Sequence, residues 1–176
     1  MKKIMFNDKY GLTKAVLEGR KTQTRRVINK FHKYIKVCED AGFQPWSLSE
    51  YSKYKVGEVV AIAQKYRDIP SLSEHYMFTG HKGWDNKMFV KGEDMPYHIK
   101  ITNVRVERLQ DISDEDCLAE GITYDCGVFK YTVDNALTKT FMTAKEAYAS
   151  LIDKVGKKGT WESNPWVFVY EFQLVD

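Results

Sequence analysis

The residues best suited to chemistry lie in one short stretch, Gly19–Arg26, which reads GRKTQTRR. This stretch sets a lysine and a threonine three residues apart among three arginines: Lys21, Thr24, Arg20, Arg25 and Arg26. A hydroxyl among cations suits an anionic ligand, or a hydrolytic site in which threonine is the nucleophile. Solvated side chains at a strand edge are the plainer interpretation, and the motif alone leaves both open.

Whether Lys21 and Thr24 can act together depends on where the next strand begins. If the strand starts directly after Gly19, side-chain alternation puts the two on opposite faces, whereas an intervening turn lets them converge. A threonine attacks only when a base takes its proton, and a lysine desolvated among arginines has a lowered pKa. A converged pair therefore predicts a nucleophile at Thr24 and a base at Lys21.

Charge is distributed unevenly along the chain. The net charge of the 176 residues is +3, but residues 1–37 hold eleven lysines and arginines and only two acids. The remaining residues are acidic on balance. A basic N-terminal segment predicts an anionic partner, most commonly the phosphates of a nucleotide or nucleic acid. A solvated basic surface is the alternative.

Composition excludes several classes of protein. With 43% hydrophobic and 29% charged residues, the chain can form one packed domain over 1–176. No apolar run approaches the roughly 20 residues that span a bilayer, and the N-terminus lacks a secretory signal. Three cysteines without a CxxC pair and four histidines without metal-ligand spacing predict no disulfide scaffold, no metal and no cofactor. We expect a cytoplasmic protein without a membrane partner.

Strands and helices are predicted around this stretch. A helix capped by Asn7 or Asp8 should end at Gly19, and strands are expected over 1–6, 98–109 and 166–174. Segments 20–28 and 57–63 are each expected to be a turn that leads into a strand. The apolar residues of the 98–109 strand change phase, which requires a bulge near Thr102–Asn103 and is typical of a strand bent around a small barrel.

Two further helices have clear start signals. Ser113 precedes an acidic first turn in a helix that ends at Glu120, and Thr143 opens a capping box. Segments 29–55 and 68–96 lack any period and are expected to be loop-rich insertions. The predicted fold is α+β, a small, mostly antiparallel β-barrel flanked by helices.

Four blocks of the sequence, in this order, resemble the ASCH domain family, and more closely ASCH proteins of bacterial and prophage genomes. They are GRKTQTRR, VGEVVAIA, ITNVRVERLQDISDEDCLAEGI and NPWVFVYEF. The resemblance implies a PUA-like barrel, with 29–55 and 68–96 as insertions outside it. It also implies binding of RNA or nucleotides in a cleft beside the glycine-lysine-threonine motif.

One branch of this family removes the acetyl group from N(4)-acetylcytidine. The resemblance carries its proton acceptor, nucleophile and proton donor onto Lys21, Thr24 and Glu120. Glu120 ends a short helix, where burial would suit it to deliver a proton to a leaving amine. A solvated Glu120, or one paired with an arginine of the basic strand, is the alternative.

The predicted function is an amidohydrolase acting on an acylated pyrimidine nucleoside. Arg20, Arg25 and Arg26 are the expected nucleotide- or RNA-binding residues, together with Trp84, whose loop position suits stacking on a base. A tryptophan that closes a core is the other interpretation of Trp84. The alternative function is a non-catalytic RNA-binding module using the same cleft. An RNA-cleaving enzyme comes third, because it usually needs a histidine pair or a carboxylate-held metal.

Overall fold

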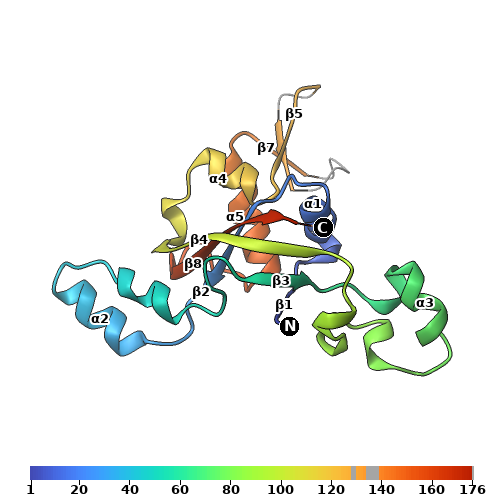
Figure 1. The fold of residues 1–176 in the computed structure, drawn as a ribbon. Helices are drawn as coiled ribbons and strands as arrows, with labels where there is room; N and C mark the ends of the chain where they lie inside the picture. Colours follow the sequence, from blue (N-terminus) through green and yellow to red (C-terminus); the bar gives the residue numbers. More distant parts are fainter. Residues whose placement is uncertain (128–129, 134–138, 176) are drawn as a thin grey trace.

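The computed structural model describes residues 1–127, 130–133 and 139–175 (Figure 1). A five-stranded mixed sheet in the order β1-β3-β4-β8-β2 forms its centre. These strands are β1 (Lys3–Ile4), β2 (Gln23–Val27), β3 (Val59–Ile62), β4 (His98–Arg108) and β8 (Trp166–Leu174). β1 runs parallel to β3, and the other three pairings are antiparallel.

The long central strand β4 carries the bulge that the sequence predicts. Its register against β8 shifts between Ile101, which pairs with Phe172, and Asn103, which pairs with Glu171. An extra residue at this point changes which side chains face inward, so apolar residues on both sides of the bulge can be buried.

The predicted barrel is not closed among the described residues. The strand order leaves β1 and β2 as the two edges of the sheet. β1 has only two residues, too few to form a long run of main-chain hydrogen bonds with β2. A side-chain hydrogen bond links the two edges instead, because Arg26 Nη2 donates to the Met5 carbonyl at 2.6 Å. We call this junction between Met5 and Arg26 the seam.

Three helices pack on the sheet and enclose the main core. They are α1 (Leu12–Leu17), α4 (Asp114–Ala119) and α5 (Ala144–Val155), and they bury residues such as Val16, Cys117 and Leu151. The caps predicted at Ser113 and Thr143 are confirmed. Asn7, however, caps a separate 3-10 turn, Asp8–Tyr10, so α1 begins later than expected, after Gly11. No described helix is long and apolar enough to cross a membrane.

A second, three-stranded sheet projects from the top of Figure 1. It consists of β5 (Thr123–Asp125), β6 (Lys130–Thr132) and β7 (Thr140–Phe141). Both of its strand pairings are antiparallel.

Segments 29–55 and 68–96 contain more helix than the sequence predicts. The first holds α2 (His32–Asp40) and a 3-10 helix (Trp46–Tyr51), and the second holds α3 (Pro70–Tyr76) and several 3-10 turns. They extend from opposite sides of the central sheet in Figure 1. Each is anchored by a small apolar cluster, around Ile35 and Leu48 in one case and Tyr66 and Ile69 in the other. Helices this short leave too few apolar positions to reveal a period.

Candidate active site

A turn precedes β2, and this brings Lys21 and Thr24 to one place. Gly19 adopts a left-handed conformation (φ 72°), and the strand begins only at Gln23. Lys21, Thr24 and Glu120 consequently line one cavity of about 50 Å³, together with Tyr148 of α5. The sequence left open whether the strand starts directly after Gly19 or after a turn. The structure has the turn, so the Lys21 and Thr24 side chains reach the same cavity.

Lys21 and Glu120 form a buried ion pair. Lys21 Nζ lies 2.5 Å from Glu120 Oε2 and also donates to the Glu120 main-chain carbonyl at 2.8 Å. Their side chains are only 1% and 5% exposed. Glu120 is the C-terminal cap of α4, so the ammonium also lies where the helix dipole favours a cation.

The environment of Lys21 makes its proton easier to remove than that of a solvated lysine. Burial lowers the pKa of Lys21, the Glu120 carboxylate opposes this shift, and the charges of Arg26 and Arg25 add to it. The net direction is downward, as expected for a catalytic base.

Two hydroxyl groups in this cavity lack hydrogen-bond partners among the described residues. The Thr24 hydroxyl makes none, although the residue is only 5% exposed. The Tyr148 hydroxyl is fully buried and also unpartnered. Burial raises the pKa of Tyr148 well above its usual value, so the group stays an O–H donor. Helical spacing in the sequence predicts only a core position for Tyr148. A buried tyrosine hydroxyl usually has a hydrogen-bond partner, so a tyrosine at a core position could have indicated a polar site there.

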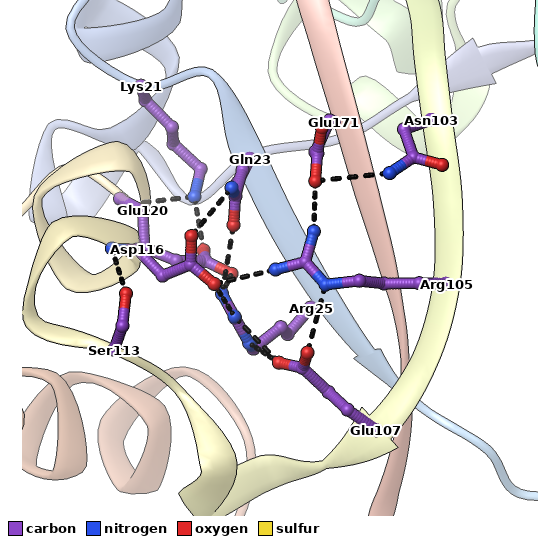
Figure 2. Close-up of polar contacts among 10 residues, drawn as sticks. All are labelled: Lys21, Gln23, Arg25, Asn103, Arg105, Glu107, Ser113, Asp116, Glu120 and Glu171. Carbon is purple, nitrogen blue, oxygen red and sulfur yellow. Dashed lines mark hydrogen bonds and ion pairs between the residues drawn. The ribbon is translucent and has the colours of Figure 1, made fainter.

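Arg25 lies beside the pair, at the centre of an ion network (Figure 2). Its guanidinium group contacts Glu107 at 2.7 Å, Asp116 at 2.5 Å and Glu120 at 3.3 Å, and its side chain is fully buried. Arg105 extends the network through Glu107, Asp116 and Glu171. Arg25, expected to bind an anionic ligand, is therefore already neutralised by carboxylates of the protein itself.

The other predicted binding residues are scattered. Arg20 is exposed and pairs with Glu18 at 2.7 Å, whereas Arg26 lines the Lys21 cavity and crosses the seam. Trp84 lines a different cavity, of about 380 Å³, within segment 68–96, and the two cavities share no lining residue. The structure does not bring Trp84 to the candidate site. Within the described ranges, no three His, Cys, Asp or Glu side chains are grouped to hold a metal ion.

The ion network predicts a loss of stability in acid. Burial alone would raise the pKa of Asp116, but hydrogen bonds from Arg25 and Gln23 and the charges of Arg25 and Arg105 outweigh it and lower the pKa. A carboxylate whose folded-state pKa is lowered stabilises the fold fully above its unfolded-chain pKa, about 3.9. We therefore expect the unfolding free energy to fall as pH drops from about 5 through the lowered pKa.

Chemical denaturation at a series of pH values tests this expectation. Asp116→Asn should be less stable than the wild type at pH 7, and the difference should shrink as the pH falls through the lowered pKa of Asp116, because protonated Asp116 is uncharged like asparagine. Asp111→Asn, an exposed change nearby, serves as the control. A difference between wild type and Asp116→Asn that stays constant with pH would contradict the role assigned to Asp116.

Comparisons with known proteins returned structural matches only. No family model matches the sequence, and no curated protein matches it significantly. One similar solved structure is a protein of Enterococcus faecalis V583 that carries the family label DUF984, with 15% identity and a TM-score of 0.43. The alignment covers 94% of this chain and 67% of that one. Another is an ASCH domain from Lactobacillus crispatus JV V101, with 12% identity, a TM-score of 0.44, and coverage of 95% and 72%.

Proposed function

We propose that this protein hydrolyses the amide bond between a small acyl group and a pyrimidine nucleoside, with N(4)-acetylcytidine as the reference substrate. One observation carries the proposal. A buried lysine–glutamate pair lines the same small cavity as a threonine hydroxyl that has no hydrogen bond to any described residue, at Lys21, Glu120 and Thr24. The ASCH resemblance of the sequence supplies the choice of substrate.

The ion pair can provide both a base and an acid. Moving one proton from the Lys21 ammonium to the Glu120 carboxylate produces a neutral amine and a carboxylic acid, and burial of Lys21 favours the neutral amine. The amine then takes the Thr24 proton as the hydroxyl oxygen attacks the acyl carbon. The acid protonates the leaving exocyclic nitrogen, and the acyl group remains on Thr24 as an ester.

Water completes the cycle with the same two groups. A second proton transfer from the Lys21 ammonium to the Glu120 carboxylate first restores the neutral amine and the acid. The amine then takes a proton from water as the water oxygen attacks the ester carbon, and the acid gives its proton to the Thr24 oxygen, which releases the acyl group as a carboxylic acid and leaves Lys21 and Glu120 charged as before. In this structure Lys21 Nζ donates a hydrogen bond to Glu120 and not to the Thr24 hydroxyl. Catalytic hydrogen bonds of this kind often form fully only when substrate is bound.

The size of the cavity sets which part of the substrate enters it. A volume of about 50 Å³ is far below that of typical ligand pockets, about 300–1,000 Å³. A small acyl group matches this volume, so the nucleoside itself must lie outside the cavity.

A non-catalytic binding module is the second candidate. Lys21 and Glu120 already satisfy each other, and a satisfied buried pair can be purely structural. In that case the same residues hold α4 against the start of β2, and no acyl group is released.

Acyl release and a change at Glu120 separate the two candidates. The wild type should convert N(4)-acetylcytidine to cytidine and acetate, measured by liquid chromatography with mass spectrometry. Glu120→Gln keeps the shape but cannot act as the acid, so the rate should fall about 10²–10⁴-fold. Glu115→Gln, an exposed change in α4, should leave the rate unchanged. Absence of acyl release by the wild type, or a full rate in folded Glu120→Gln, would favour the binding module.

A further inference from the structure

A large groove adjoins the candidate active site along the seam. It has a volume of about 690 Å³ and shares Met5 and Arg26 with the small cavity. Its volume lies in the range of sites that hold nucleotide-sized ligands. We call it the seam groove. It lies where β1 and β2 do not pair among the described residues, and segment 29–55 supplies part of its lining.

The seam groove has an unbalanced positive charge. Among the described residues, four cationic residues and no acidic residue line it: Lys3, Arg26, Lys30 and Lys53. None of the four forms a salt bridge in the part of the chain that the structure describes, in contrast to Lys21 and Arg25 in the neighbouring cavity. The Lys3 ammonium donates to the main-chain carbonyls of Lys87, Met88 and Val90, so the charge left to attract an anionic ligand such as a phosphate is that of Arg26, Lys30 and Lys53.

Aromatic rings form much of the remaining surface. Tyr51 is 64% exposed, and its ring centroid lies 5.4 Å from that of Phe31, which is 38% exposed. Tyr54, Phe168 and Tyr170 also line the groove, but Tyr54 and Tyr170 are buried, so Tyr51 and Phe31 are the rings with accessible faces. Rings with accessible faces beside unpaired cations are the combination that binds single-stranded nucleic acids, because unpaired bases stack on the rings while cations contact the backbone.

The backbone at Phe31 is held in an unfavourable conformation. Its φ of 67° lies in the left-handed region, which a bulky aromatic residue rarely adopts. Strained residues of this kind concentrate at ligand-binding sites, where the surrounding structure maintains them. In this conformation the Phe31 ring contacts the Tyr51 ring at the groove.

We propose that the seam groove binds a single-stranded polynucleotide, so that the acylated pyrimidine reaches the small cavity as part of a strand. The second half of this statement rests on the proposed function, whereas binding in the groove does not. The strand must be unpaired, because bases held in a duplex cannot stack on these side chains. The shared residues Met5 and Arg26 place a bound base beside the cavity that takes the acyl group.

Fluorescence anisotropy with an unmodified, labelled pyrimidine oligoribonucleotide tests binding independently of catalysis. Tyr51→Ala should weaken binding about 5- to 150-fold, the effect of removing one base stack. Lys30→Gln combined with Lys53→Gln should reduce the slope of log affinity against log salt by about 0.7 for each phosphate that the protein no longer neutralises. Trp46→Ala and Lys33→Gln are matched controls, exposed in the same segment and outside the groove.

The outcomes distinguish this inference from the proposed function. Binding that depends on Tyr51 supports the groove even if no acyl group is released. Similar binding of the matching single-stranded DNA also supports it, since the rings and cations do not read the sugar. Hydrolysis of the free nucleoside without binding of the oligonucleotide would overturn the inference. Tighter binding of a duplex, or equal affinities for Tyr51→Ala and Trp46→Ala, would overturn it as well.

Discussion

Thr24→Val should abolish release of the acyl group from N(4)-acetylcytidine while leaving the fold intact. Valine keeps the β-branched shape that suits a strand, and Thr24 lies inside β2 opposite Tyr170. The change removes only the hydroxyl, which has no hydrogen bond to lose within the described residues. If Thr24 forms the acyl ester, removal of the nucleophile should lower kcat by about 10⁴–10⁶-fold. Steady-state kinetics and thermal unfolding of the same samples measure both effects.

Two variants make the Thr24 result specific. Thr24→Ser retains a hydroxyl and should retain measurable turnover. Thr22→Val removes an exposed hydroxyl nearby and should behave as the wild type. Mass spectrometry of the wild type mixed rapidly with substrate should detect the acyl group on the peptide containing Thr24. Turnover by Thr24→Val close to the wild-type rate would contradict a nucleophilic threonine.

Arg25→Met should strongly destabilise the fold. The wild-type guanidinium is fully buried and contacts Glu107, Asp116 and Glu120. Methionine approximates its length but provides no donor, so these carboxylates lose their shared partner. Breaking a buried ion pair by removing one member lowers stability by about 3–5 kcal/mol. Chemical denaturation at pH 7 measures this difference.

Arg20→Met is the matched control for this experiment. Arg20 belongs to the same basic stretch, but it is exposed and pairs only with Glu18. Exposed pairs contribute about 0–1 kcal/mol, so the control should have a small effect. If the two variants were equally stable, Arg25 would not organise the network, and its predicted role in binding a ligand would regain support.

Local signals in the sequence determined much of the architecture. The change of apolar phase in 98–109 located the bulge, and short-range hydrogen-bonding patterns located the caps at Ser113 and Thr143. These features depend on residues a few positions apart, so a single sequence contains them. The same kind of signal identified Lys21 and Thr24 as a pair with two possible registers.

The surroundings of Lys21 and Thr24 depend on contacts between distant parts of the chain. Arg25 and Arg26 are adjacent in sequence, yet one is neutralised by carboxylates from β4 and α4 and the other crosses the seam without a salt bridge among the described residues. The count of basic residues could not distinguish them, because the acids involved lie more than 80 positions away.

Closure of the barrel and the location of Trp84 also depend on contacts between residues far apart in the sequence. Whether β1 and β2 pair is determined by how the whole sheet packs, and the open edge creates a groove that no local pattern indicates. Trp84 had a suitable loop and composition for stacking, but its segment packs on the opposite side of the sheet from α2. Local sequence patterns thus specified the strands and helices of the central core and the residue types of the site. Packing between distant segments decided which side chains meet, because burial and charge pairing act between residues close in space rather than in sequence.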